Sequence, residues 1–424
     1  RMSEEAISDT PARQLISVGG PQPSVDVVED AGGPAPRYAH SAVFDAETER
    51  MIVFGCTRNW LNGRNDVWAL TTYAMVMAAS TDSAVFSNAM GIRPHAGYSN
   101  GSMIELDDPA HKHRRMLLSR GFTPRQVRDR AVLVREICDE IIDDVCEQGT
   151  CDFVWDIAAR LPLILIGDML GFERDSFDDL LRWSDEMVKS QTSTDAEALV
   201  RATAAFEEYQ PFQRAAIAER RERPTDDLVS VLAHAEVEGE KLSDDDLLME
   251  LLLVLVGGDE TTRHVISGGM KALLDDPQQM ALLQEDHDRL ESGIEEMLRW
   301  VTPIKNMNRT TTRPVELEGQ VIPEGAQVLL FYPSANRDET VFDDPFRFDV
   351  LRSPNNHLAF GFGSHFCLGN ALARLELRTM FEQLFTRLPD LRLADDSPLP
   401  VRAANFISGF EAMPVEFTPT ARLA

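Results

Sequence analysis

A glycine-rich loop at residues 360–369 places one cysteine just ahead of a predicted helix. The loop reads FGFGSHFCLG, with Cys367 as its thiol. The apolar residues that follow recur at a spacing of about 3.6, which is typical of a helix: Leu372, Leu375, Phe381, Leu384, Phe385 and Leu388. A helix N-terminus favours an anion and lowers the pKa of a thiol, and the glycines let a flat, bulky group approach the backbone. The loop therefore suits a thiolate that holds a metal in a macrocycle; a structural cysteine in a glycine turn is the alternative.

A second group of polar residues interrupts an otherwise apolar helical pattern. Ser243 and the acids after it predict a helix start, and the pattern from Leu247 to about Leu274 is apolar on nearly all sides in its first half, as in a buried helix. Residues 257–262, GGDETT, then break this pattern. Each glycine weakens a helix by roughly 1 kcal/mol, and buried polar groups are costly without partners. Such a break indicates a functional site; a kink with a satisfied buried acid is the alternative.

The composition limits the possible partners and the compartment. The chain has 424 residues, 43% of them hydrophobic, and a net charge of −29, so we expect an acidic surface and no nucleic-acid partner. Five cysteines without a CxxC pair indicate a reducing compartment and neither a zinc site nor a disulfide framework. The apolar runs are too short for a membrane span, and the first residues do not resemble a signal peptide. We therefore expect a soluble, cytoplasmic protein.

Helical patterns dominate the chain after residue 72, whereas strand patterns lie toward both ends. Helices are predicted at 127–148, 152–170, 176–189 and 196–223, with a mobile lid tip at 190–195, and strands at 315–321, 327–332 and 404–417. In the first 70 residues, a Gly/Pro-rich tail precedes three strand patterns that resemble one blade of a Kelch propeller. Because a single blade cannot bury its own face, a β-hairpin that joins the first sheet of the main domain is the alternative.

The loop motif F-G-x-G-x-H-x-C-x-G resembles the haem-binding signature of the cytochrome P450 superfamily. Two more motifs are similar to that family, G-x-E-T at residues 258–261 and E-x-x-R at residues 296–299, and the likeness extends over roughly residues 66–419. It implies a mainly α-helical fold with small β-sheets, a triangular prism in which haem b lies between the long central helix and the cysteine-bearing helix. It also implies an N-terminal extension, 1–64, and a catalytic domain, 65–424.

The resemblance assigns five residues to haem binding. Cys367 is implied as the proximal iron ligand, and so as the metal-binding residue. His111 and Arg115 match the family's H-x-x-x-R pair, which holds a propionate, and residues four apart share one helix face. Arg309 and His365 complete the set that the propionates are expected to contact.

The resemblance also implies the proton chemistry and a structural brace. Thr261 is the expected donor to oxygen on the distal face of the haem, and Glu260 is the expected relay acid, so these two are the predicted catalytic residues. The two glycines before them are expected to open room for dioxygen. Glu296, Arg299 and Arg347 are expected to form a structural network that braces the haem-side core.

The segments expected to line the distal pocket are mostly apolar. They contribute Ile92, Met187, Leu251, Val254, Ile304, Met307, Phe406 and Ile407. A large apolar molecule is therefore expected there, held by burial at roughly 25 cal/mol per Å². At a finer level the chain is similar to actinobacterial sterol side-chain (26/27-) hydroxylases of cholesterol catabolism. This implies O2-dependent hydroxylation of the terminal side-chain carbon of cholesterol or cholest-4-en-3-one.

A basic segment offers a docking surface for an electron donor. Residues 109–135 carry eight Lys/Arg and one acid in an otherwise acidic chain; a solvated basic face is the alternative. The resemblance implies electrons from NAD(P)H through a ferredoxin reductase and a ferredoxin. The ferredoxin is expected to dock on a monomer near Arg114, Arg120, Arg374 and Arg378.

Three other functions remain open. The chain could be a P450 that acts on another lipid or a macrolide, or a peroxygenase driven by peroxide, although the Glu260-Thr261 pair argues against the latter. It could also be a haem-thiolate sensing protein without enzymatic activity, with the N-terminal segment as its interaction module.

Overall fold

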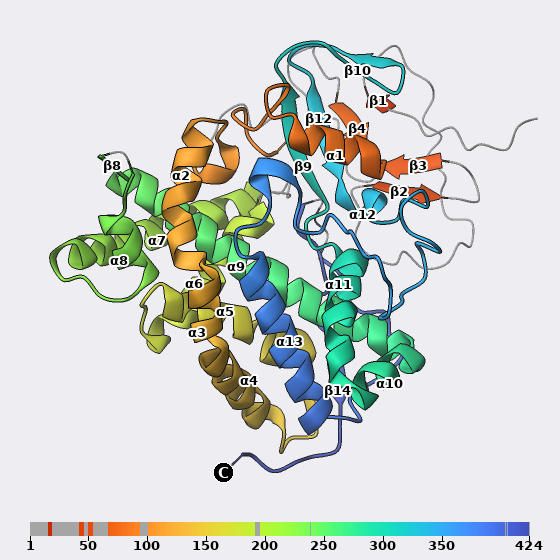
Figure 1. Ribbon diagram of the computed structural model, residues 1–424. Coiled ribbons are helices and arrows are strands. Elements are labelled where there is room, and N and C mark those ends of the chain that lie inside the picture. The colour runs from red at the N-terminus through yellow and green to blue at the C-terminus, as the bar shows by residue number, and fades with distance from the viewer. Residues whose placement is uncertain are drawn as a thin grey trace, which may run out of the picture.

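The fold is described from a computed structural model, which covers with defined placement residues 16–18, 42–45, 50–53, 67–93, 101–190, 196–237, 239–402, 404 and 406–423. These residues are mainly helical with small sheets, as predicted, and the largest sheet lies at one corner (Figure 1). The helices are α1 (Tyr73–Thr81), α2 (Ala110–Leu118), α3 (Pro124–Asp129), α4 (Ala131–Val145), α5 (Arg160–Met169), α6 (Phe177–Ser190), α7 (Ala196–Glu222), α8 (Leu228–His234), α9 (Asp244–Asp275), α10 (Pro277–Glu285), α11 (Leu290–Val301), α12 (Tyr332–Ala335) and α13 (Asn370–Arg387).

The largest sheet joins strands from the first 90 residues with two strands from residues 306–331, in the order β1-β4-β12-β9-β5. Its strands are β1 (Ile16–Val18), β4 (Val67–Leu70), β5 (Phe86–Ser87), β9 (Asn306–Thr311) and β12 (Gln327–Phe331). β12 pairs with β4 in parallel and with β9 antiparallel. The smaller pairings are β2 (Ala42–Asp45) with β3 (Arg50–Val53), β7 (Glu236–Val237) with β8 (Glu240–Lys241), β10 (Val315–Leu317) with β11 (Gln320–Ile322), and β14 (Pro414–Glu416) with both β13 (Arg392–Leu393) and β6 (Thr150–Asp152).

The N-terminal strand patterns are only partly described. β2 and β3 pair with each other in a separate two-stranded sheet, whereas β4, the third strand pattern, joins the main sheet. Most of the predicted Kelch-like segment, and most of the predicted lid tip at 190–195, lies outside the described residues. In the described part of the chain, no helix combines the length and apolar composition that a membrane crossing requires.

The predicted central helix is α9, and it starts at a capping box. The Ser243 hydroxyl accepts a hydrogen bond from the backbone N–H of Asp246, and the Asp246 carboxylate accepts one from the backbone N–H of Ser243. The helix then continues without a break to Asp275, so the glycine pair does not end it. A Cβ on Gly258 would lie 2.6 Å from the Ile166 side chain of α5, whereas one on Gly257 would meet nothing within 4 Å. One glycine therefore allows close helix packing, and the other leaves open space.

The structural brace forms around Glu296 and Arg299, both fully buried in α11. The guanidinium of Arg299 donates to both Glu296 carboxylate oxygens at 2.7 Å. The predicted third member is wrong: Arg347 contributes only its backbone carbonyl, at 3.1 Å from Arg299. Arg352 instead supplies the side chain, with its Nε 3.2 Å from Glu296. The reason is that the Arg347 side chain is exposed, whereas the Arg352 side chain turns inward to the buried carboxylate.

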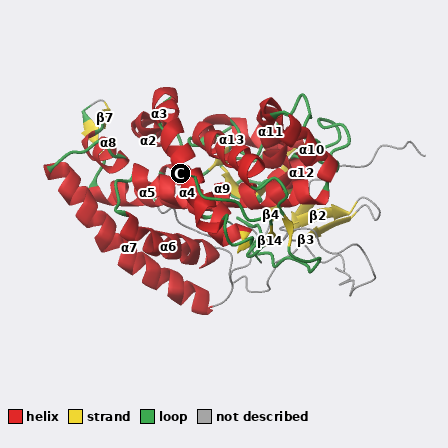
Figure 2. Cartoon of the chain, turned by 90° about the horizontal axis from the view of Figure 1, so that it is seen from below, coloured by secondary structure: helices red, strands yellow, loops and turns green. Residues whose placement is uncertain are grey.

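Figure 2 shows α6 and α7 side by side at one edge of the molecule, away from β2, β3 and β4. α6 also packs on α9, so an element distant from the cysteine loop reaches the polar segment of the central helix.

Candidate active site

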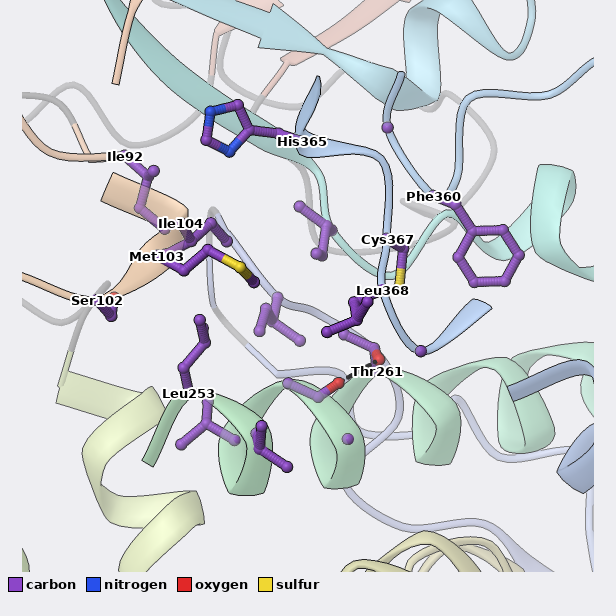
Figure 3. A pocket seen from close by; sticks show the side chains of 18 of the residues that line it. Ile92, Ser102, Met103, Ile104, Leu253, Thr261, Phe360, His365, Cys367 and Leu368 are labelled. Carbon is purple, nitrogen blue, oxygen red and sulfur yellow. Dashed lines mark hydrogen bonds between the residues drawn. The ribbon is translucent and has the colours of Figure 1, made fainter. Parts of the chain in front are cut away.

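One cavity of about 670 Å³ connects the cysteine loop with α9. Its walls come from α2, α7, α9, β9, α13 and the loop near residue 406. Thr261 projects from α9 toward the loop that carries Cys367 and Leu368 (Figure 3). The elements that the sequence singled out separately therefore face one shared space.

The cysteine loop is fixed by its own backbone. The backbone N–H of Cys367 donates to the Phe360 carbonyl at 2.9 Å, and the N–H of Phe366 donates to the Gly363 carbonyl at 3.1 Å. Gly361 and Gly363 have positive φ angles of 68° and 74°, a conformation that residues with a Cβ rarely adopt. A Cβ on Gly363 would also collide with the Ser80 carbonyl, 2.1 Å away. The loop motif thus encodes one backbone path that brings the sulfur into the cavity.

The helix start lowers the pKa of the Cys367 thiol, as predicted, but the net shift from the protein groups is upward. Burial raises the pKa of Cys367, and this outweighs the backbone N–H groups of Gly369 and Asn370 and the positive charges of Arg115 and Arg374, which lower it. The desolvated thiol therefore needs a further positive charge to be a thiolate. A metal ion supplies such a charge, because a coordinating thiol loses its proton.

Four side chains that can carry positive charge surround one end of the cavity: His111, Arg115, Arg309 and His365. The two histidine rings lie 3.9 Å apart between centroids, and Arg115 donates to the Phe366 carbonyl at 2.5 Å. Burial lowers the pKa of Arg309, and burial together with its charged neighbours lowers the pKa of His365 to about 3.

Among the described residues, few carboxylates neutralise the positive charge of this cluster. His111 contacts Asp108 at 3.2 Å, and its Nε2 is buried without a partner. No carboxylate forms an ion pair with the other three members, Arg115, Arg309 and His365, within the described residues. Buried cations are rarely left without anions. The cluster, the glycine cradle and the thiol together fit a flat, dianionic, metal-bearing group such as haem.

The two predicted catalytic residues lie in different environments. The Thr261 hydroxyl lines the cavity and donates to the Gly257 carbonyl at 3.0 Å. Glu260 is fully buried and does not line the cavity. Its Oε2 lies 2.6 Å from Arg263 and 2.8 Å from Arg402. The structure therefore separates the hydroxyl, which faces the cavity, from the acid, which faces a buried ion-pair network.

The network links three distant elements. Arg402, close to the C-terminus, also donates to Asp185 of α6 at 2.6 Å. Burial alone would raise the pKa of Glu260, but Arg263, His264 and Arg402 hold it well below its usual value. Glu260 is thus ionised and firmly paired. Arg402 and Asp185 were not singled out from the sequence, although a lone arginine among the apolar residues near 401–407 was a usable signal.

The apolar side chains predicted for the pocket are largely those that line the cavity. Leu251 is the exception among the eight, since it is buried away from the cavity. Phe206 and Ala202 of α7 were missed, although they line it. Lys305 does not enter the cavity: its ammonium donates to the carbonyls of Val301 and Thr302, both at 2.9 Å, and burial lowers the pKa of Lys305 to about 7.

Comparison with known proteins places these features in one family. Residues 166–398 match the family model described as Cytochrome P450. A protein from Mycobacterium tuberculosis (strain CDC 1551 / Oshkosh) named Steroid C26-monooxygenase is 53% identical over 359 residues, which are 84% of this chain and 96% of that protein. A Mycobacterium bovis protein named Methyl-branched lipid omega-hydroxylase is 37% identical over 84% of this chain and 85% of its own length.

A solved structure shares the fold. The solved structure of a Mycobacterium marinum cytochrome P450 in complex with pseudoionone aligns with a TM-score of 0.79 and 35% identity, and the alignment covers 85% of this chain and 90% of that one. These similarities confirm the predicted fold class and include both α9 and the cysteine loop.

Proposed function

Because the chain belongs to the cytochrome P450 family, we propose that it is a haem-thiolate monooxygenase that hydroxylates the terminal side-chain carbon of a sterol such as cholesterol or cholest-4-en-3-one. One observation carries the proposal: the cavity that Cys367 lines is also walled by apolar residues of α7, α9 and the segment near residue 406. The name of the relative at 53% identity supports the substrate class.

In this proposal the chain holds haem b through five residues. The Cys367 sulfur would ligate the iron, and His111, Arg115, Arg309 and His365, which line the same cavity, would pair with the propionates. When bound, haem supplies a thiolate-ligated iron for oxygen chemistry. The apolar walls exclude water from the reacting centre and hold the substrate by burial.

Thr261 is proposed as the proton donor nearest the reaction. Its hydroxyl lines the cavity and uses the Gly257 carbonyl as its acceptor, so a rotation about one bond would turn the proton toward the cavity. The relay role of Glu260 stays a prediction. For that role the carboxylate must exchange its contacts with Arg263 and Arg402 for a path to Thr261.

A ferredoxin fed by an NAD(P)H-dependent reductase is the proposed electron donor. Of the four arginines predicted to dock it, Arg114 pairs with Asp246 and Glu250, and Arg374 pairs with Glu295. These two arginines therefore form ion pairs with carboxylates of the chain itself. Fewer cationic side chains are left for the docking surface than the sequence predicted. The domain boundary at residue 65, the monomeric state and the cytoplasmic location likewise stay predictions.

A spectral titration tests the substrate. Cholest-4-en-3-one, a methyl-branched fatty acid and a macrolide are added separately to the ferric holoprotein. The expected result is a low-to-high-spin shift with the sterol at the lowest concentration, followed by hydroxylated product when NAD(P)H, reductase and ferredoxin are supplied. A tighter shift with the branched acid would favour a lipid ω-hydroxylase, and product with peroxide but none with ferredoxin would favour a peroxygenase.

The haem-thiolate assignment has its own test. The reduced protein with carbon monoxide should show the red-shifted Soret band of a thiolate ligand, and Cys367→Ser should abolish it. Cys151→Ser, at a half-buried cysteine outside the cavity, is the matched control. A band that survives Cys367→Ser would overturn the ligand assignment.

A further inference from the structure

Glu250 is a fully buried acid on α9 whose side chain does not reach the cavity. Its neighbours along the helix, Met249, Leu252 and Leu253, line the cavity, whereas Glu250 itself does not. An acid in the apolar half of a buried helix is costly unless it has a partner. Neither the haem site nor the proposed proton donor makes use of this acid, so its partners must account for it.

Glu250 joins two segments that are distant from it in the sequence. Its Oε1 accepts a hydrogen bond from the backbone N–H of Met103 at 2.7 Å and another from the Arg114 guanidinium of α2 at 3.0 Å. Arg114 also donates to the backbone carbonyl of Gly101 at 3.3 Å and to Asp246, one turn earlier in α9, at 2.9 Å. The acid and the arginine therefore hold the segment before α2 at two backbone positions.

The segment held in this way, residues 101–105, forms part of the cavity wall. Four of its residues line the cavity: Ser102, Met103, Ile104 and Glu105. The Met103 side chain is directed into the space above Leu253 of α9 (Figure 3). A shift of the Met103 backbone would change the shape of the cavity, because the side chain would move with it.

The charge of Glu250 sets the strength of these contacts. Burial raises the pKa of Glu250 to about 7, although Arg114 and the Met103 N–H lower it, and Asp246 on the same helix raises it further. Hydrogen bonds to an ionised group are roughly twice as strong as those between neutral groups. The contacts with Arg114 and Met103 are therefore strongest when Glu250 is ionised.

We propose that Glu250 is a positioning residue that, with Arg114, fixes residues 101–105 as a cavity wall and thereby sets which large apolar ligands the cavity accepts. Glu250 acts through the Met103 backbone and touches no ligand itself. A large ligand that packs on this wall needs the wall in one position, whereas a small ligand that reaches only the iron does not. This inference deepens the proposed function and rests on it for the choice of a sterol as the large ligand.

Hydrogen exchange tests the positioning role without any ligand. In the holoprotein, the backbone amides of residues 101–105 should exchange fastest in Glu250→Leu, which removes the acceptor. Glu250→Gln keeps an acceptor oxygen but loses the charge, and should exchange at a rate between that of Glu250→Leu and that of the wild type. Asp245→Asn, which removes an acid that pairs with Arg214 on the surface of the same helix, is the matched control. Wild-type exchange in either Glu250 variant would overturn the proposal.

Ligand discrimination tests the effect on the cavity. Cholest-4-en-3-one and imidazole, a small ligand of ferric iron, are titrated into the ferric holoprotein at one pH, and the two dissociation constants are compared. Glu250→Gln should weaken sterol binding several-fold and leave imidazole binding unchanged, whereas Asp245→Asn should change neither. Equal weakening of both ligands, or of neither, would show that Glu250 does not set the ligand preference.

The pH profile of sterol binding tests the role of the charge. In the wild type, the affinity should rise as pH increases through about 7, because a ligand that needs the fixed wall favours the ionised acid. Glu250→Gln should lack this rise, and a flat profile in the wild type would contradict the role of the charge. A wild type that binds no sterol but shows the expected exchange differences would instead overturn the substrate proposal.

Discussion

The cysteine loop and the polar segment of α9 face the same cavity but are held in place by different means. The loop is held by short-range backbone hydrogen bonds, such as that from Cys367 to Phe360, and by glycines at positive φ. The α9 segment is a continuous helix whose acids are fixed by distant side chains: Ser184 of α6 donates to Asp259, and Arg402 of the C-terminal region donates to Glu260.

This difference determines which kind of substitution should disrupt each half of the site. A loop defined by backbone geometry depends on residue shape and is insensitive to pH. A network of buried charges depends on every partner, because removal of one leaves another buried and uncompensated. Substitutions in the cysteine loop and in the α9 segment are therefore expected to differ in the size of their effects.

Gly363→Ala should cause the largest loss. The added Cβ meets the Ser80 carbonyl, and the φ of 74° is unfavourable for alanine, so the loop cannot keep its path. We expect most of the purified protein to lack haem, measured as the absorbance ratio of haem to protein. Gly319→Ala is the matched control, since its φ is also positive, at 77°, but a Cβ there meets nothing within 4 Å and the residue lies outside the cavity. Similar haem loss in both variants would show that shape at Gly363 is not what holds the loop.

Arg402→Met should destabilise the α9 half. It leaves Glu260 and Asp185 buried with fewer cations, and breaking a buried pair costs about 3–5 kcal/mol. The free energy of unfolding in urea measures the loss. Arg392→Met removes an exposed pair with Glu416 and should cost no more than about 1 kcal/mol. Equal losses would mean that the buried network contributes no more than a surface pair.

Thr261→Ala should leave the fold intact and impair coupling. The variant removes the hydroxyl that lines the cavity. We expect product per NAD(P)H to fall, with release of peroxide, because a positioned proton donor contributes roughly 10²–10⁴-fold to the rate of its step. Thr386→Ala, on the exposed side of α13, provides the control. Wild-type coupling in Thr261→Ala would refute the donor assignment.

His264 gives the α9 half a predicted pH dependence. Burial lowers its pKa to about 4, below the ordinary value near 6.5, so the unfolded chain binds a proton in this window that the folded chain does not. The free energy of unfolding should therefore fall as pH drops from about 6.5 to about 4, by about 1 kcal/mol per pH unit from this residue. Urea unfolding at several pH values should show a shallower slope for His264→Gln and an unchanged slope for the exposed His234→Gln. If the free energy of unfolding changed with pH equally in wild type and in His264→Gln, His264 would not be the source of this pH dependence.

Much of the architecture could be predicted from local patterns. The span of α9 followed from its cap at Ser243 and its apolar residues, and the start of α13 followed from the glycine loop before it. Adjacent residues determine such features, because capping and helical periodicity act within a few positions. The predicted helix at 127–148, in contrast, divides into α3 and α4 at Arg130, a boundary without a strong sequence signal.

By itself, the sequence determined the thiol in its glycine loop, the candidate cations for an anionic group, and the hydroxyl on the central helix. The tertiary structure alone decided which charges pair. It placed Arg352 rather than Arg347 on Glu296, and it bound Glu260 to Arg402, 142 residues away. The physical reason is that burial and charge pairing depend on which distant segments meet, and these two effects set whether an acid keeps its proton.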